Sequence, residues 1–327
     1  MKCSSVWKYN ISNFQLREGM IMRTNSRLSE AYKNARVEYF DDDSKYIFFS
    51  DCHRSDGSLS DEFNRNKNIY LYALEYYFKN GFVYVEAGDG DELWEHRKFK
   101  DIVNANHDVF EAIKKFFYHD RLIMLYGNHN VYLKNQEYVK NNYYYYYDEY
   151  HEMVFEFLKG IKPCEALVLK YKKTGQDILT VHGHQGDLPN DQFWVPSMLS
   201  LKYFWRFMHS FGFQNPSSPV KNAQKRHKIE KNYCKWIDEN RIMLICGHTH
   251  RSKFPKRDEL PYFNTGCCIF PSSITGIEIT NGSVLLIQWK IRANRDGILQ
   301  IERNILRGPE PLEKYDIRNT TAACGDK

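Results

Sequence analysis

Five short apolar runs in this chain end in side chains that can bind a metal ion, and this repeated arrangement constrains the fold more than any other feature. One run, residues 242–245, is followed by Gly247 and by the pair His248 and His250. Short apolar runs bounded by glycine are typical of buried strands. The other four runs end in Asp51-Cys52-His53, Gly88-Asp89-Gly90-Asp91-Glu92, Gly127-Asn128-His129 and His182-Gly183-His184. Because ligands at the carboxyl ends of several strands form the usual cleft of an α/β enzyme, we predict an α/β fold with a site at the strand ends.

Length and composition set limits on this prediction. The 327 residues, 42% of them hydrophobic, suffice for one large domain or two modest ones. A net charge of +5 does not by itself predict nucleic-acid binding. Residues 1–10 lack the charged and then apolar pattern of a secretion signal, and no apolar run approaches the ~20 residues of a membrane-spanning helix. The eight cysteines have no framework spacing, which favours reduced thiols and a cytoplasmic protein.

Apolar periodicity and turn residues predict further elements. The sequence predicts helices at 66–79 and 108–118 and paired strands at 165–171 and 177–181. We also expect residues 134–160 to be helical. The tyrosine run at 143–147 could form a strand, but the charged residues on both sides of it favour a helix. Asn281-Gly282 predicts a hairpin turn. The chain after Arg307 is polar and is expected to be frayed.

The predicted organisation is one main domain with two extensions. An N-terminal arm over residues 1–44 packs on a domain over 45–310, and a polar tail covers 311–327. Within the domain, the segment 188–236 breaks the alternation of strands and helices. Its part from 193 to 213 is apolar on nearly every side of a helix, so it must be buried or must contact lipid or a partner.

We expect the insert 188–236 to form a helical lid, although a helix that is simply part of the core is the alternative. The insert leaves the core just after His182 and returns just before the strand that leads to His248. It therefore emerges beside the predicted ligands. A basic helix forms its second half. The aromatic segment could then receive a hydrophobic part of a substrate or a membrane surface.

Single motifs leave room for other interpretations. Asp51 and His53 could converge on one cation, or could be a turn aspartate beside a surface histidine. Asp89, Asp91 and Glu92 at the end of a buried strand would repel one another without a cation, although a solvated loop is the alternative.

Taken together and in this order, the five motifs resemble those of the calcineurin-like metallophosphoesterase superfamily, over roughly residues 45–290. The resemblance implies a four-layer α/β/β/α sandwich of two mixed sheets with helices outside, and a site for two metal ions. Its implied ligands for one ion are Asp51, His53, Asp89 and His250, and for the other Asp89, Asn128, His182 and His248, with Asp89 as the bridge. It also implies that His129 protonates the leaving group and that Glu92 orients His129.

The chemistry of these residues agrees with such roles. Mixed imidazole and carboxylate ligands suit Mn, Fe, Zn or Co better than Ca, and we expect Mn to support activity in vitro. Two such ions can clamp a phosphoryl group and activate a bridging hydroxide, which would attack phosphorus directly. Arg54 and Arg251 follow ligands immediately and are expected to bind phosphate oxygens. His184 is a third candidate for substrate binding.

The expected function is therefore that of a two-metal phosphoesterase, a hydrolase of a phosphoester or pyrophosphate bond in a phosphorylated small-molecule or lipid-like substrate. The motif Gly-Asp-x-x-Glu and the aromatic and basic insert resemble, more loosely, the UDP-2,3-diacylglucosamine hydrolase branch. The expected location is the cytoplasm or, through residues 193–213, the membrane surface. The oligomeric state is left open.

Other functions remain as alternatives. A nuclease or a cyclic-nucleotide phosphodiesterase would use the same metal ions, with the lysines of residues 221–235 contacting phosphates. A protein Ser/Thr phosphatase is disfavoured, because Glu92-Leu93-Trp94 and Asn130 stand where that branch has Asp-Arg-Gly and Glu. A scaffold without activity is disfavoured because the ligands are intact at every motif.

Overall fold

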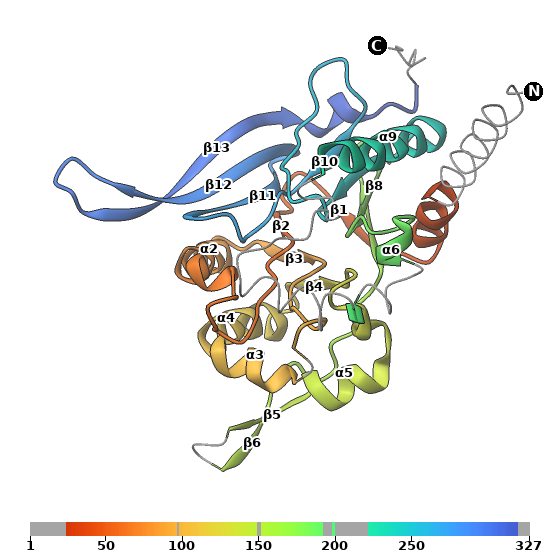
Figure 1. The fold of residues 1–327 in the computed structure, drawn as a ribbon. Helices are drawn as coiled ribbons and strands as arrows, with labels where there is room; N and C mark the ends of the chain where they lie inside the picture. The colour runs from red at the N-terminus through yellow and green to blue at the C-terminus, as the bar shows by residue number, and fades with distance from the viewer. Residues whose placement is uncertain (1–23, 97, 149–151, 192–197, 200–221, 320–327) are drawn as a thin grey trace, which may run out of the picture.

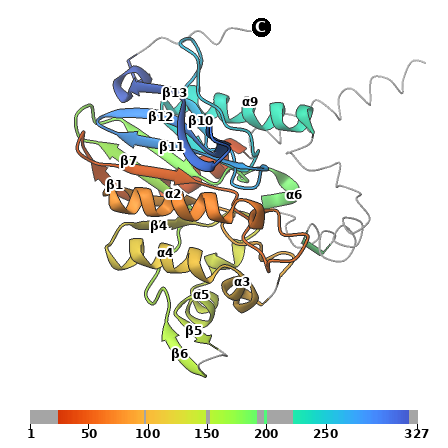
Figure 2. The same cartoon turned by 90° about the vertical axis from the view of Figure 1, so that its left-hand side faces the viewer.

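Two mixed β-sheets stack face to face at the centre of the fold (Figures 1 and 2). The computed structural model describes residues 24–96, 98–148, 152–191, 198–199 and 222–319. One sheet has the order β13-β12-β11-β2-β3-β4 and the other the order β1-β7-β8-β9-β10. The strands of the first sheet are β2 (Tyr46–Phe49), β3 (Val83–Ala87), β4 (Leu122–Leu125), β11 (Ser273–Thr280), β12 (Ser283–Ala293) and β13 (Leu299–Pro311). Those of the second sheet are β1 (Arg36–Phe40), β7 (Ala166–Tyr171), β8 (Asp177–Val181), β9 (Met243–Cys246) and β10 (Tyr262–Asn264).

Helices cover the outer face of each sheet, which completes the predicted four layers (Figure 2). The six-stranded sheet carries α2 (Lys67–Lys79), α3 (Phe99–Ala105), α4 (His107–Tyr118) and, at its margin, α5 (Gln136–Tyr143). The five-stranded sheet carries α9 (Ala223–Asn240) and a helix over residues 24–33. The helices predicted at 66–79 and 108–118 are α2 and α4, so both predictions are confirmed.

The position of these strands between the helices and the second sheet explains why their sequences are mostly apolar. In β2, Ile47 and Phe49 pack against the helices, whereas Tyr46 and Phe48 face the other sheet. A strand between two apolar layers has no solvated face, so both alternating positions must be apolar. Burying each such side chain stabilises the fold by roughly 1.5–3 kcal/mol.

Parallel pairing brings the ends of the five predicted strands to one place. Strands β2, β3 and β4 are parallel neighbours, because α2 and then α3 and α4 return the chain to the starting edge. Strands β8 and β9 are parallel neighbours in the other sheet. Carboxyl ends of parallel strands lie at the same edge. The loops after all five strands therefore meet at one end of the sandwich.

The prediction of helix over residues 134–160 is wrong beyond Tyr143. The chain forms the hairpin β5 (Tyr145–Asp148) and β6 (Met153–Glu156) instead. Tyr145 and Tyr147 are exposed and Tyr146 is partly buried, which is the alternation of a strand. Aromatic side chains favour strands, and this preference outweighs the flanking charges.

The predicted hairpin turn at Asn281-Gly282 is confirmed, but the predicted fraying after Arg307 is wrong for residues 308–319, the described part of that segment. Both turn residues have positive φ, 50° and 63°, as a two-residue hairpin loop requires. Strand β13 continues to Pro311, and the 3-10 helix η4 (Leu312–Tyr315) follows. Leu312 is buried between the two sheets, and this apolar contact holds the segment in place.

The described parts of the predicted arm and insert belong to the domain. Strand β1, inside the arm, pairs with β7 along its whole length. The aromatic segment 193–213 lies outside the described residues except for Met198 and Leu199. At the other end of the insert, α9 buries Tyr233, Trp236 and Ile237 against the five-stranded sheet. The boundaries at residues 44 and 310 and the lid stay predictions.

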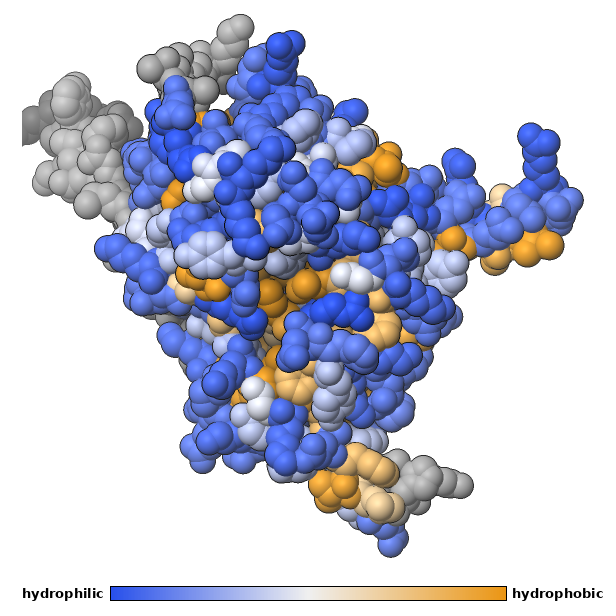
Figure 3. Space-filling view, turned by 180° about the vertical axis from the view of Figure 1, so that it is seen from behind, coloured by the Kyte–Doolittle hydropathy of each residue, from blue (hydrophilic) through white to orange (hydrophobic). Residues whose placement is uncertain are grey.

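Two hairpins project from the domain and carry apolar side chains into solvent (Figure 3). Met153 and Val154 of β6 are more than half exposed, and so are Ile298 and Leu299 at the tip of the β12–β13 hairpin. Among the described helices, none combines the length and the apolar character needed to cross a membrane.

Candidate metal centre

Five of the predicted metal ligands have an unusual backbone conformation. Asp51, His53, Asp89, His248 and His250 have φ values between 47° and 65°, in the left-handed region that side chains disfavour. These five make up half of the non-glycine residues with positive φ in the described part of the chain. Such strain costs about 1–3 kcal/mol a residue and concentrates at functional sites.

Backbone hydrogen bonds hold the loops after β2 and β3 together. His53 N donates to Asp89 O at 2.9 Å, and Arg54 N donates to Gly90 O at 2.9 Å. Glycine permits the closest approach of the next loop, because a Cβ at Gly127 would overlap the side chains of Asp89 and His182. The loops can therefore bring their side chains onto one point.

Among the described residues, the structure assembles three groups of possible metal ligands, each with its ligand atoms within 4.8 Å of one another. The groups are Asp51, His53 and His250; His53, Asp89 and His129; and Asp89, His182 and His248. His250 Nε2 lies 3.0 Å from Asp51 Oδ1, and His182 Nε2 lies 3.0 Å from Asp89 Oδ2. Asp89 belongs to two groups, which agrees with its predicted place between two ions.

The residues present are suited to hold metal ions. Asn128 Oδ1 is buried and has no hydrogen-bond partner among the described residues. Asn128 lies close to the other candidate ligands, because the preceding residue, Gly127, packs on Asp89 and His182. An unpaired buried oxygen is costly unless a ligand or ion contacts it. Carboxylate, amide and imidazole donors suit Mn, Fe, Zn or Co.

Without a cation, protons balance the buried carboxylates. Burial alone would lower the pKa of His53, but its hydrogen bond to Glu92 and the charge of Asp89 raise that pKa to about 10. Burial opposes ionisation of Asp51, yet His250 and His182 lower its pKa to about 2. A bound cation would take over the role of the protonated His53 imidazole.

His129 lies beside the ligand groups, and a carboxylate contacts its ring. His129 Nδ1 lies 2.7 Å from Glu92 Oε2, and its backbone N donates to Asp89 Oδ1 at 2.8 Å. The ring of Trp94 stacks on the imidazole, with centroids 4.4 Å apart. The His129 side chain is 19% exposed, so a substrate can reach it. The sequence did not indicate that Trp94 contacts His129, because only the fold brings the two rings together.

Asn130 occupies the position at which protein Ser/Thr phosphatases have a glutamate. It closes the turn that carries Asn128. Its Oδ1 accepts a hydrogen bond from Gly127 N at 2.6 Å. The residue therefore shapes the loop from within, while Glu92 orients His129.

The prediction that Arg54 binds phosphate is wrong. Its guanidinium is fully buried, lies over the Phe110 ring and makes a two-bond ion pair with Glu86 at 2.6 and 3.0 Å. Nε donates to Asp91 Oδ1 at 2.8 Å. The positive charge of Arg54 thus balances the negative charge of Asp91, so Asp91 does not need a metal ion as its counter-ion. Arg251 is exposed and lies over the Phe270 ring, and its contact with phosphate stays a prediction.

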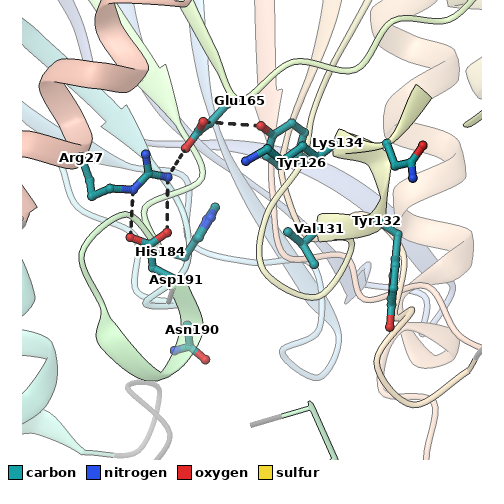
Figure 4. Close-up of a pocket in the computed structure, with 10 residues that line it drawn as sticks. Arg27, Tyr126, Val131, Tyr132, Lys134, Glu165, His184, Asn190 and Asp191 are labelled. Carbon is teal, nitrogen blue, oxygen red and sulfur yellow. Dashed lines mark hydrogen bonds and ion pairs between the residues drawn. The ribbon is translucent and has the colours of Figure 1, made fainter. Parts of the chain in front are cut away.

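His184 and Asp187 lie on the loop after β8 and flank the metal ligands. The buried ring of His184 lies 5.6 Å from that of His182 and lines a pocket (Figure 4). Asp187, which sequence reasoning missed, contacts His248 Nε2 at 3.3 Å and Lys225 of α9 at 3.3 Å. A carboxylate on one ring nitrogen orients a histidine so that the other nitrogen can bind a metal.

Comparisons with known proteins add little to this picture. The sequence matches no protein-family profile and no curated protein. Among solved structures, Vps29 from Chaetomium thermophilum matches with a TM-score of 0.35 and 10% identity, over 80% of this chain and 96% of Vps29. The fold assignment rests on the strand order and the layers. The architecture is a four-layer α/β/β/α sandwich of two mixed sheets.

Proposed function

We propose that this chain is a metal-dependent phosphoric ester hydrolase that cleaves a phosphoester or pyrophosphate bond. The observation that carries the proposal is the set of three interlocking ligand groups, which share His53 and Asp89 and adjoin the pair of His129 and Glu92. A cluster of ion pairs with a purely structural role would not need strained backbone at Asp51, His53, Asp89, His248 and His250. Strain of this kind concentrates at functional sites.

The seven predicted ligands would hold two ions, and Mn is the first to test. Bound cations supply polarisation of the phosphoryl group and activation of water for attack. Asp89 lies between the two ligand sets, and its loss should disturb both. Ser50 supports Asp51 by donating a hydrogen bond to Oδ2, which also accepts from His248 N at 3.0 Å.

His129 is the proposed general acid. Because Glu92 contacts Nδ1, Nε2 is the nitrogen available to hold the proton that the leaving oxygen takes. The Glu92 carboxylate also accepts a hydrogen bond from His53, so one carboxylate aligns the acid with a metal ligand. Stacking on Trp94 keeps the imidazole plane in this orientation.

The test is metal reconstitution with a matched pair of variants. Metal-free protein is loaded with Mn, Fe, Zn or Co and assayed on p-nitrophenyl phosphate, phosphomonoesters, phosphodiesters, pyrophosphates and nucleic acids. Asp89→Asn should lose ions and activity. Asp120→Asn makes the same change at an exposed aspartate that also has positive φ, and should behave as wild type.

Two bound ions per chain and inactivation by chelators are expected. Full activity of the metal-free protein, or two tightly bound ions in Asp89→Asn, would contradict the proposal. Selective cleavage of nucleic acid with a steep salt dependence would favour the nuclease alternative.

A further inference from the structure

A pocket of about 380 Å³ is lined by His184, whose ring lies 5.6 Å from that of the metal-ligand candidate His182. Figure 4 shows the residues that line this pocket. Its volume is within the range of small-molecule sites. The lining residues come from the helix at 24–33, from the turn after β4 and from the loops around β7 and β8. They include Arg27, Tyr132, Glu165, His184, Val131 and Asp191.

The pocket and the metal centre share two loops. His184 lies two residues after the ligand His182, and their rings are 5.6 Å apart. Val131 and Tyr132 begin the 3-10 helix η2 (Val131–Lys134), directly after the loop of Asn128. A substrate with its phosphorus at the ligand groups would therefore extend into this pocket.

The charges of the pocket cancel one another. Arg27 Nη2 lies 2.9 Å from Glu165, and Arg27 Nε lies 3.1 Å from Asp191 (Figure 4). The remaining cation that lines the pocket, Lys134, is exposed. Two carboxylates beside one paired guanidinium disfavour a second phosphate group, because like charges repel at short range.

The walls combine hydrogen-bonding groups with the aromatic rings of Tyr126 and Tyr132. His184 Nδ1 is buried and has no hydrogen-bond partner among the described residues, and its ring points into the pocket (Figure 4). Among the described lining residues, Val131 is the only aliphatic one. An acyl chain would leave this nitrogen unpaired, whereas a hydroxyl group would satisfy it.

We propose that this pocket binds an uncharged, hydroxyl-bearing part of the phosphate ester, namely a sugar ring or the ribose of a nucleoside. The assignment names the substrate class of the proposed function and rests on it. It differs from the expectation of a hydrophobic substrate part, which came from residues 193–213.

The test compares two identical substitutions. Val131→Phe narrows the pocket without removing a polar group, and Val154→Phe makes the same change on the exposed β5–β6 hairpin. Mn-loaded proteins are assayed on glucose 6-phosphate, AMP, dodecyl phosphate and pyrophosphate. Binding of glucose and of adenosine to the metal-free proteins is measured separately by saturation-transfer NMR.

We expect kcat/KM for glucose 6-phosphate or AMP to exceed that for dodecyl phosphate by at least about tenfold, since unpaired polar groups reject analogues that lack their partner. Val131→Phe should remove most of this preference and the NMR signal, while Val154→Phe should retain both. An NMR signal with glucose would indicate a sugar site, and a signal with adenosine alone would indicate a nucleoside site.

The outcomes separate this inference from the proposed function. If no ester, including p-nitrophenyl phosphate, is cleaved with any metal, the proposed function fails. If Val131→Phe then loses the NMR binding of glucose or adenosine while Val154→Phe keeps it, the pocket would still be supported as a binding site. A preference for dodecyl phosphate or pyrophosphate, or the absence of NMR binding in wild type, overturns the assignment.

Discussion

Replacing Arg54 by methionine tests the most buried ion pair next to the metal centre. Arg54 reaches Glu86 and Asp91 with three hydrogen bonds of 2.6 to 3.0 Å, and all three side chains have no exposed surface. Tyr84 donates to Glu86 and Tyr143 to Asp91, at 2.9 and 2.7 Å. These hydroxyls supply hydrogen bonds but no positive charge. Arg54→Met would leave two buried carboxylates without a counter-ion.

The expected loss is large relative to the stability of a domain. Removing one partner of a buried ion pair costs about 3–5 kcal/mol, because the other charge stays desolvated. Typical domains have a free energy of unfolding of about 5–15 kcal/mol, so roughly a fifth or more of it would be lost. The metal centre should suffer as well, because the backbone of Arg54 joins the loops that carry His53 and Asp89.

Urea unfolding measures the first effect, and titration with Co²⁺, followed by its visible absorption, measures the second. We expect Arg54→Met to lower the free energy of unfolding by about 3–5 kcal/mol and to weaken Co²⁺ binding. Adding Glu86→Gln should restore part of the stability, since one buried charge is removed. The matched control is Arg251→Met, which removes an exposed arginine over Phe270 and should cost less than about 1 kcal/mol. Equal losses in the two variants would refute the reasoning.

Three further predictions concern the metal centre. His129→Ala should lower turnover by ~10²–10⁴ on esters with poor leaving groups, and less on p-nitrophenyl phosphate, with metal content intact; equal losses on both substrates would exclude His129 as the acid. Metal binding should release protons and strengthen as the pH rises from about 6 to 9, because ligands must be unprotonated. Burial lowers the pKa of His53, but Glu92 and Asp89 raise it to about 10 in the metal-free protein. Calorimetry in two buffers of different ionisation enthalpy measures the release, and a pH-independent affinity would contradict it. Asp187→Asn should weaken metal binding by about 10–100-fold relative to Asp238→Asn on α9, since it frees His248, and metal titration of both variants decides.

The strands and the ligand residues that follow them could be predicted from the order of residues along the chain. Each run is apolar at most positions on both faces because its strand lies between two apolar layers, and the chain must turn where the run stops. Metal-ligand residues directly after such runs therefore mark the site whatever the details of packing. For the same reason, the two predicted ligand sets contain all but one of the residues that the structure brings together, and His129 was predicted as the acid.

Only the tertiary structure decided which charges pair with one another. Glu86 lies 32 residues after Arg54 and inside an apolar run, so nothing local indicates that these two side chains meet. Their contact follows from the parallel pairing of β2 with β3. The contact between Asp187 and His248 likewise depends on two loops of different strands. Strand ends follow from the local order of apolar and polar residues, whereas the partner of a buried charge depends on which strands become neighbours, and this is the physical reason that Arg54 supports the metal centre and does not bind phosphate.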